Sequence, residues 1–358
     1  MPQEFCSAGA KSDVLGYKTR ASNNRRLAVS AAALLLSAAF ATTSYAQSAS
    51  DADAANEEWR ANGLEWLVAS SAGGATDTVT RQVQPFMSKI LNMTARVQNK
   101  SGGSNTAAGA PTIRDTECNT IVTWTIPALV LSTMVQKVDY DYSDFYPLGQ
   151  IAADPSAIIV GLDTPYKTMQ DLIDDAKARP GEVTAAIGSP GSDMAHIINI
   201  EKAAGVKFNI VPLGGGTQAR NAVIGGQAPM TEAGVYASQN IAQQVRYLAV
   251  QADSNPRPDL TQNAPTLTEA LNGAKNEHQV SSQGLFVSKA CYEQHPDRFK
   301  ELADALKAAM EDPEFKATVK KLNADGYYSY LSPEEFNKQI VDSIPGLQAF
   351  YDENMKGK

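Results

Sequence analysis

The sequence predicts an α/β fold with mainly parallel sheets, because short apolar strands alternate with amphipathic helices along most of the chain. Two further features sharpen this prediction. A glycine-rich turn joins a strand to a helix at residues 70–79, and a second one does so at residues 188–194. A chain of 358 residues is long enough for two domains. Since ligands bind beyond the carboxyl ends of parallel strands, we expect the two turns to face each other across a cleft.

The first turn follows an apolar strand at residues 65–69 and precedes a helix with one apolar face. That face is formed by Val79, Val83, Phe86, Met87, Ile90 and Leu91. The first amides of a helix lack partners, and the helix dipole adds partial positive charge there. Gly73 and Gly74 let a ligand approach the backbone, so the turn is suited to a carboxylate or a phosphate. An ordinary turn with Thr76 or Asp77 as N-cap explains the pattern equally well.

The other elements follow in order. We expect strands at residues 95–98, 120–125, 183–187, 208–211, 229–233 and 247–251. Residues 148–160 and 284–288 are apolar segments that we expect to carry the chain into a second domain and back. Thr168 with Asp171 predicts a helix start, and Ser332 with Glu335 forms a capping box that opens the last helix. The crossings divide the chain into one lobe of residues 59–155 with 285–358, and a second of residues 156–284.

The N-terminal residues are expected to lie outside this fold. Arg25 and Arg26 precede an apolar run at residues 27–41, and Ser44-Tyr45-Ala46 matches a signal-peptidase site. Residues 1–46 therefore predict a signal peptide, and residues 47–58 a flexible mature N-terminus. The alternatives are an uncleaved anchor, twin-arginine rather than general export, and a true start near Val14 or Leu15.

The net charge and the cysteine content limit the possible partners and the possible covalent cross-links. The formal net charge of −8 argues against a nucleic-acid partner. Cys6 lies in the leader, which leaves Cys118 and Cys291. In an oxidising compartment these two could pair as a disulfide or stay separate thiols, and the sequence leaves both open.

The mature chain is poor in catalytic patterns. The Gly188-Ser-Pro-Gly191 turn is not a nucleophile elbow, and His196 does not form a recognisable pair with a serine. No histidine or cysteine spacing predicts a metal site, and no phosphate-loop or dinucleotide motif is present. We therefore expect no catalytic residue, no metal and no cofactor. Arg220 could meet a ligand charge, but a solvated position on a helix face is the more common case.

Several motifs together point to one family. They are Ala-Gly-Gly-Ala-Thr-Asp at residues 72–77, Asn-Lys-Ser-Gly-Gly-Ser-Asn at 99–105, Asp-Phe-Tyr-Pro-Leu at 144–148, Lys-Thr-Met-Gln-Asp-Leu-Ile at 167–173, Ala-Arg-Pro-Gly at 178–181, Val-Pro-Leu-Gly-Gly-Gly at 211–216 and Gly-Gly-Gln at 225–227. In this order, over residues 64–350, the set resembles the extracytoplasmic solute receptors of tripartite tricarboxylate transporters, the Bug/TctC family.

The resemblance implies a two-lobed periplasmic binding protein of type II, the Venus-flytrap fold, with a helix-flanked sheet in each lobe. It also implies a periplasmic location, a small carboxylic-acid ligand, and a membrane transporter with a large and a small subunit as partner. We expect a monomer. In the family, the carboxylate is held mainly by amides and hydroxyls of the two glycine turns. By position these are Ser71, Ala72, Gly73, Gly74, Ala75, Thr76 and Asp77, and Gly188, Ser189, Pro190, Gly191, Ser192, Asp193 and Met194.

Trp124, Thr125, Leu213, Gly214 and Gly215 would line the cleft by the same resemblance, although Trp124 could equally pack in the core. The chain departs from the family at Ala69-Ser70-Ser71, at Asn99-Lys-Ser-Gly102, and at Glu232, where an Asp is common. We expect Glu232 to accept a ligand hydroxyl or amine, or to disfavour excess negative charge. A periplasmic hydrolase or lyase on this fold, and a ligand-presenting sensor of a two-component system, remain alternatives.

Overall fold

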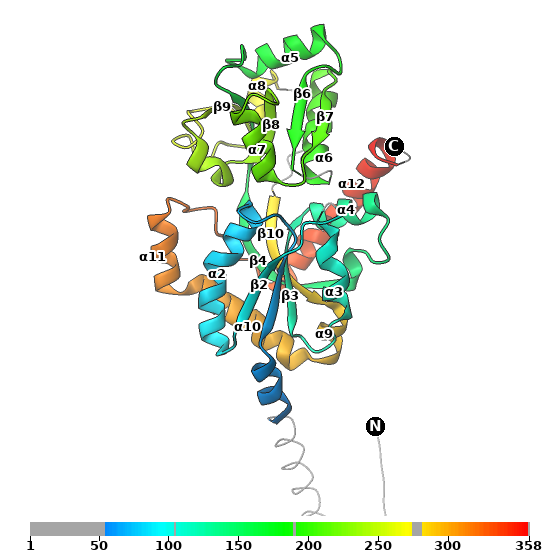
Figure 1. The fold of residues 1–358 in the computed structure, drawn as a ribbon, viewed down its shortest axis with the longest axis vertical. Coiled ribbons are helices and arrows are strands. Elements are labelled where there is room, and N and C mark those ends of the chain that lie inside the picture. The colour runs from blue at the N-terminus through cyan, green and yellow to red at the C-terminus, as the bar shows by residue number, and fades with distance from the viewer. Residues whose placement is uncertain (1–53, 104, 189–190, 274–280, 357–358) are drawn as a thin grey trace, which may run out of the picture. The chain divides into compact units, whose positions relative to one another are not determined.

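The computed structural model describes residues 54–103, 105–188, 191–273 and 281–356. They form an α/β fold with two five-stranded sheets, each flanked by helices (Figure 1). The expected signal peptide, residues 1–46, and the first part of the expected flexible segment lie outside the described residues. Residues 54–62 are helical, so the described end of that segment is not irregular. None of the described helices is long and apolar enough to cross a membrane.

The first sheet has the strand order β2-β1-β3-β10-β4. Strand β1 pairs in parallel with both β2 and β3, whereas β10 runs antiparallel to β3 and β4. The strands are β1 (Leu64–Val68), β2 (Ala95–Asn99), β3 (Thr120–Ile126), β4 (Phe145–Asp154) and β10 (Ser281–Ser288). We call this sheet and its helices the first lobe.

The second sheet repeats this plan in the order β7-β6-β8-β5-β9. Strand β6 pairs in parallel with β7 and β8, and β5 runs antiparallel to β8 and β9. The strands are β5 (Ser156–Gly161), β6 (Thr184–Ile187), β7 (Asn209–Pro212), β8 (Met230–Gly234) and β9 (Val245–Gln251). We call this sheet and its helices the second lobe. The chain enters it directly after Asp154 and is back in the first sheet at Ser281.

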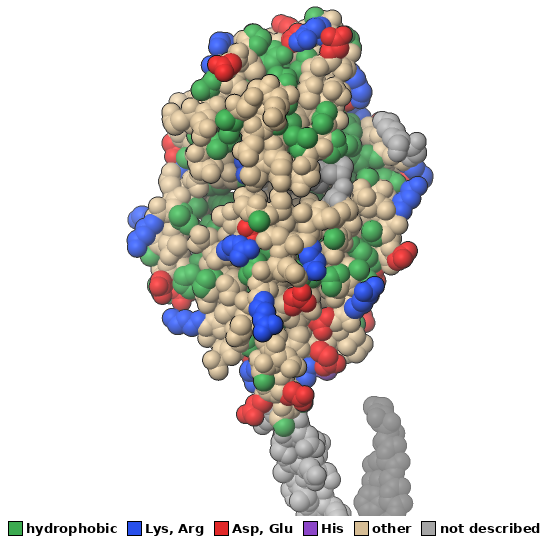
Figure 2. Space-filling view, in the orientation of Figure 1, with side chains coloured by type: hydrophobic (Ala, Val, Ile, Leu, Met, Phe, Trp, Pro, Cys, Tyr) green, Lys and Arg blue, Asp and Glu red, His purple; other side chains and the backbone are tan. Residues whose placement is uncertain are grey.

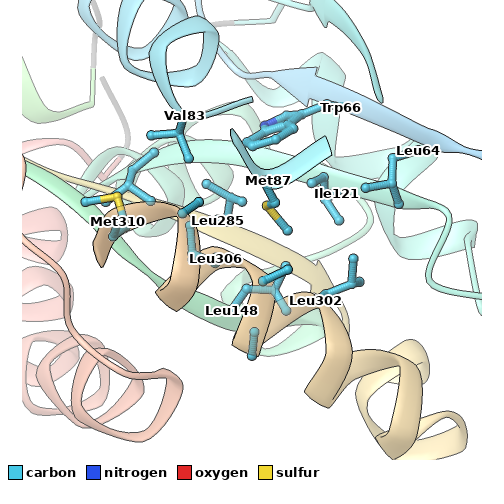
Figure 3. Packing of buried hydrophobic residues seen from close by; sticks show 14 of the residues in the cluster. Leu64, Trp66, Val83, Met87, Ile121, Leu148, Leu285, Leu302, Leu306 and Met310 are labelled. Atoms are coloured by element: carbon cyan, nitrogen blue, oxygen red, sulfur yellow. The ribbon is translucent and has the colours of Figure 1, made fainter. Parts of the chain in front are cut away.

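The helices of the first lobe enclose its core on both faces of the sheet (Figure 1). Side chains from α2 and α10 pack against the sheet strands in one cluster, which includes Trp66, Met87 and Leu306 (Figure 3). The helices are α2 (Ala75–Leu91), α3 (Gly109–Arg114), α4 (Ala128–Gln136), α9 (Lys289–Gln294), α10 (Pro296–Glu311), α11 (Pro313–Lys321) and α12 (Pro333–Asn354), with short 3-10 turns η1 (Thr106–Ala108) and η2 (Tyr142–Asp144).

A disulfide joins two distant parts of the first lobe. Cys118 and Cys291 are bonded, with their Cα atoms 5.1 Å apart, although 173 residues separate them in sequence. Both side chains are fully buried in the same core cluster. The bond ties the segment before β3 to α9, so it closes the C-terminal part of the lobe onto the N-terminal part.

The second lobe has a smaller core of its own. Residues from β5, β6 and α5 form its main cluster, with Leu172 and Ile187 fully buried. Its helices are α5 (Met169–Ala178), α6 (Ser192–Ala204), α7 (Gly216–Ile224) and α8 (Leu267–Ala270), with the 3-10 turn η3 (Tyr236–Ile241). The capping boxes expected at Thr168 and at Ser332 are both formed.

Candidate functional site

A pocket opens where residues of both lobes come together. It spans about 780 Å³, part of which is open to solvent. On the face shown in Figure 2, the surface is hollowed between the two lobes. The residues that line the pocket come from both sheets and from the first turns of several helices. They are Ala69, Ser70, Ser71, Gly74, Ala75, Thr76, Asn105, Thr125, Asp154, Ser156, Gly188, Ser192, Asp193, Gly215, Gly216, Arg220, Glu232, Ala233, Gly234, Ala237, Ser281 and Gln283.

The first glycine turn presents the start of α2 to this pocket. The N-cap is Gly74 and no side chain caps the helix, so the expectation of Thr76 or Asp77 as N-cap is wrong. The Asp77 carboxylate instead turns back and accepts a hydrogen bond from the Gly73 amide at 2.9 Å. Arg81 and Asn99 also donate to it, at 2.9 and 3.0 Å. Asp77 therefore fixes the shape of the turn and does not line the pocket.

Thr76 is the side chain of this turn best placed to meet a ligand. It lines the pocket and is 5% exposed. Its hydroxyl makes no hydrogen bond within the described part of the chain. Ser71, Gly74 and Ala75 also line the pocket, whereas Ala72 and Gly73 are exposed and lie outside its lining.

The second glycine turn uses the same device. Asp193, in the first turn of α6, accepts a hydrogen bond from the Gly188 amide at 2.8 Å. Its other oxygen accepts from the Ser192 hydroxyl at 3.0 Å. Unlike Asp77, Asp193 lines the pocket, together with Gly188 and Ser192.

Of the other residues expected at the second turn, Ser189 and Pro190 lie outside the described residues. Gly191 is the N-cap of α6 without a side-chain cap and is not part of the lining. Met194 packs against two hydrophobic clusters instead of the pocket.

A third helix start meets the pocket at Gly215 and Gly216, where α7 begins without a side-chain cap. It is packed tightly against the second glycine turn. A Cβ on Gly188 would lie 2.4 Å from the Gly216 backbone nitrogen, so only glycine fits there. A Cβ on Gly215 would lie 2.3 Å from the Ser71 hydroxyl of the first lobe. Leu213 and Gly214, also expected at the cleft, are exposed and lie outside the lining.

Arg220 is the one cation among the described lining residues, and the expectation of a solvated position is wrong. Its side chain lies one turn into α7 and is only 8% exposed. It donates to the Thr217 hydroxyl at 3.3 Å, and among the described residues it makes no ion pair. Burial lowers the pKa of Arg220, while nearby Asp154 acts in the opposite direction. A buried guanidinium without a carboxylate partner is costly, and an anion in the pocket would relieve that cost.

Two buried carboxyl groups line the other side of the pocket. Asp154, at the end of β4, is 1% exposed and accepts hydrogen bonds from the Tyr236 and Ala237 amides at 3.0 and 3.1 Å. Burial raises the pKa of Asp154 to about 7, against the effect of those two bonds. Glu232, on β8, is 6% exposed, and its Oε1 lies 3.0 Å from Nδ1 of the buried His196. The structure gives Glu232 Oε2 no hydrogen bond among the described residues.

The first lobe adds neutral groups. Gln283 of β10 is 2% exposed, lines the pocket, and its Oε1 has no hydrogen-bond partner in the described structure. Thr125 of β3 lies opposite it in the strand register and also lines the pocket. Trp124 points elsewhere. It is fully buried in a hydrophobic cluster, edge-on to Phe145 at 6.0 Å between ring centroids, so it packs in the core rather than lining the cleft.

The arrangement of Ser156, His196 and Glu232 is not that of a catalytic triad. The Ser156 hydroxyl and the Glu232 carboxylate both approach the same ring nitrogen, Nδ1 of His196, at 3.4 and 3.0 Å. In a triad the serine and the acid bond to opposite ring nitrogens. Within the described ranges, no cluster of His, Cys, Asp or Glu could hold a metal ion.

Residues 79–349 match the family model described as "Tripartite tricarboxylate transporter family receptor", TctC. The chain belongs to this family. Among curated relatives, the "UPF0065 protein in gbd 5′region" of Cupriavidus necator is 28% identical over 312 residues, which is 86% of this chain and 91% of that protein. Members of the TctC family are solute-binding receptors.

Solved structures show the same fold. A Rhodopseudomonas palustris protein with adipate superposes with a TM-score of 0.72 at 20% identity, covering 81% of this chain and 96% of that one. MatC from the same organism, with bound malate, gives 0.70 at 18% identity, covering 80% and 98%. At these identities the likeness concerns the fold, which is the two-lobed fold of periplasmic binding proteins.

Of the residues expected from the sequence, the structure brings together at the pocket a part of each glycine turn with Thr125, Gly215 and Glu232. It also brings in residues that the sequence analysis missed or underrated. Asp154 ends the strand before the crossing, Gln283 lies just after the return, and Arg220 follows the third glycine turn by one helical turn. Asp154 and Gln283 could have been found from the sequence, because each is a polar side chain next to a segment that was expected to cross between the lobes.

Proposed function

We propose that this receptor captures a small carboxylate in the pocket between its lobes and delivers it to a tripartite membrane transporter with a large and a small subunit. The observation that carries the proposal is Arg220. It is a buried guanidinium that lines the pocket and makes no ion pair among the described residues.

The helix starts around the pocket add donors for the same anion. Helices α2, α6 and α7 each begin without a side-chain cap, at Gly74, Gly191 and Gly215. Their first amides and their dipoles favour a negative charge. Together with the Thr76 hydroxyl, they can surround a carboxylate with hydrogen-bond donors and so offset its desolvation.

Donors from two lobes would also couple binding to closure. The Thr217 hydroxyl donates to the Gly73 carbonyl at 3.2 Å, which connects the start of α7 to the first glycine turn. One anion that bonds to both lobes stabilises their closed arrangement, because neither lobe alone completes its shell of donors. The lobe boundaries that we propose are residues 59–155 with 285–358, and residues 156–284.

The remaining parts of the proposal concern location and assembly. The receptor acts in the periplasm as a monomer, after export directed by residues 1–46 and their cleavage. The family assignment supports the periplasmic location, since these receptors serve membrane transporters. N-terminal sequencing of the exported protein is expected to begin at Gln47.

Ligand-induced thermal stabilisation tests the proposal, because a ligand that binds only the folded state raises its stability. We expect at least one acid in a panel of mono-, di- and tricarboxylates to raise the melting temperature of the mature protein without being consumed. Arg220→Gln should remove that rise, and Arg114→Gln, which changes an exposed arginine, should keep it. If no acid stabilises the wild type, the proposed function is wrong. If Arg220→Gln responds fully, Arg220 does not hold the acid and this pocket is not the binding site. Turnover of an ester or amide would instead favour the hydrolase alternative.

A further inference from the structure

The charges around the pocket do not match a ligand that is only an acid. Among the described residues that line it, three carry carboxyl groups (Asp154, Asp193 and Glu232) and one carries a positive charge, Arg220. A ligand with two carboxylates would add two negative charges to this surrounding. At short range in a partly buried site, each contact between like charges is unfavourable.

The three carboxyl groups differ in the number of hydrogen bonds that they accept from the described residues. Asp193 is held by the Gly188 amide and the Ser192 hydroxyl. Asp154 is held by the amides of Tyr236 and Ala237. Glu232 has only the contact between its Oε1 and His196, and within the described residues its Oε2 accepts nothing.

Glu232 is therefore a buried acceptor with unused capacity. It is 6% exposed and faces the pocket from β8, in the second lobe. Buried carboxylate oxygens are normally hydrogen-bonded, and a lone pair without a donor costs free energy. The matching feature of the first lobe is Gln283, whose buried Oε1 also lacks a donor. Both acceptors line the same pocket, and a ligand group with several N–H bonds is the kind of donor that they lack.

We infer that the ligand is an amino carboxylic acid, with its carboxylate toward Arg220 and the helix starts and its protonated amine toward Glu232 and Gln283. This inference rests on the proposed function and narrows it to one class of acid. An ammonium group supplies three donors and one positive charge, whereas a hydroxyl supplies one donor and no charge. The ammonium thus places a positive charge beside Glu232, and the zwitterion as a whole adds no net charge to the pocket, whereas a dicarboxylate adds two negative charges.

Matched pairs of ligands isolate the amine. Alanine and lactate, γ-aminobutyrate and succinate, and ε-aminocaproate and adipate each share a skeleton and differ in one group. Each ligand is titrated calorimetrically into the wild-type protein at neutral pH. In the pair whose chain length fits the pocket, the amino acid should bind more tightly than the acid without an amine. We expect the amino acid to bind about tenfold or more tightly than its partner.

Two variants sharpen the result. Glu232→Gln keeps the shape but removes the charge, so the preference for the amino member should fall about tenfold or more, and the dicarboxylate should gain affinity. Glu182→Gln changes an exposed glutamate in the same lobe and should leave the preference unchanged. Circular dichroism of both variants checks that they are folded.

The outcomes separate this inference from the proposed function. If lactate, succinate or adipate binds the wild type more tightly than its amino partner does, in the pair whose length fits, the inference is overturned while the receptor function stands. If Glu232→Gln is folded and keeps the wild-type preference, the amine does not bind there and the inference also fails. If no acid of either kind binds, the proposed function itself fails. The comparison of matched ligands uses the wild-type protein alone, so it tests the inference even if Glu232→Gln does not fold.

Discussion

The two glycine turns of this receptor share one construction and differ in what they show to the ligand. In each turn, an aspartate from the following helix accepts a hydrogen bond from a glycine amide of the turn, at 2.9 Å for Asp77 and 2.8 Å for Asp193. In the first lobe, Arg81 and Asn99 cover Asp77, which stays out of the pocket. In the second lobe, Asp193 lines it.

The difference extends beyond the turns. The first sheet and its helices supply neutral groups to the pocket, including Thr76, Thr125 and Gln283. The first lobe also supplies one carboxyl group, that of Asp154, which ends β4 where the chain crosses to the second lobe, whereas the second lobe supplies Asp193, Arg220 and Glu232. Two lobes with similar topology can therefore divide their work. Under the proposed function, the first lobe would contribute mainly uncharged donors for an anion, and the second most of the charged groups that select among anions.

Removal of the disulfide is expected to have the largest effect, and it should act on the first lobe alone. Cys118→Ala with Cys291→Ala should lower the free energy of unfolding by about 2–5 kcal/mol, the usual loss for a native disulfide. The ranking of ligands should not change, because neither cysteine lines the pocket. Denaturant unfolding and calorimetric titration measure the two quantities. A changed ligand ranking in the folded double variant would contradict the division of labour between lobes.

The second lobe should be sensitive to added bulk at its turn. In Gly188→Ala, the new Cβ would lie 2.4 Å from the Gly216 nitrogen and 2.7 Å from its Cα, and neither backbone atom can move independently. We expect a loss of about 1–3 kcal/mol in stability, typical of overpacking, with weaker ligand binding. Gly74→Ala is the matched change in the first lobe, where the nearest atom is the Ser71 carbonyl oxygen at 3.0 Å. Gly74→Ala should lower the free energy of unfolding, measured by chemical denaturation, by less than Gly188→Ala does. An equal or larger loss would contradict this comparison.

The neutral donors of the first lobe can be tested at Thr76. Thr76→Ala should weaken binding of the identified acid by about 1–3 kcal/mol, the range for a hydrogen bond to a charged group. It should not change the ratio of affinities within a matched pair of acids. Thr78→Ala removes an exposed hydroxyl on the same helix and should bind like the wild type. Calorimetry on both variants decides, and an altered ratio for Thr76→Ala would place selection in the first lobe.

A smaller effect is expected from Asp154, the residue where the chain crosses between the lobes. It concerns the pH dependence of the protein's stability. Its pKa is raised from 3.8 to about 7, so the folded chain keeps this proton to higher pH than the unfolded chain does. The stability that it contributes is present below about pH 4 and is lost as pH rises through about 7. As the pH rises from about 5 to about 8, the melting temperature of Asp154→Asn should therefore fall less than that of the wild type. The exposed Asp163→Asn should follow the wild type, and identical slopes in all three proteins would exclude this role.

Much of this architecture was readable from the sequence, because local patterns determined it. The alternation of strands and helices, the capping boxes at Thr168 and Ser332, and the two glycine turns all arise from residues close together in the chain. The expected strand at residues 120–125 differs from β3 by one residue at its end. These features depend on propensity and periodicity, which a single sequence carries.

The parts that the sequence left open depend on contacts between distant residues. Arg220 looks like an ordinary helix-face arginine until α7 packs beside the pocket, and only the structure shows that it is buried. Trp124 and the two cysteines had two equally good interpretations, which differ in long-range packing. The role of Asp77 also reversed, since its carboxylate bonds to the turn behind it rather than capping the helix. Side-chain direction in the tertiary structure decides each of these cases.

The most direct test of a shared site is one calorimetric double-mutant cycle across the two lobes, with the best-binding acid of the panel. Thr76→Ala tests the first lobe, Arg220→Gln the second, and the combined variant their coupling. The account predicts that each single variant weakens binding while remaining folded, and that the ligand contacts both lobes at once. Wild-type affinity in either folded single variant would mean that the acid is not held between these two groups, and the pocket described here would not be the binding site.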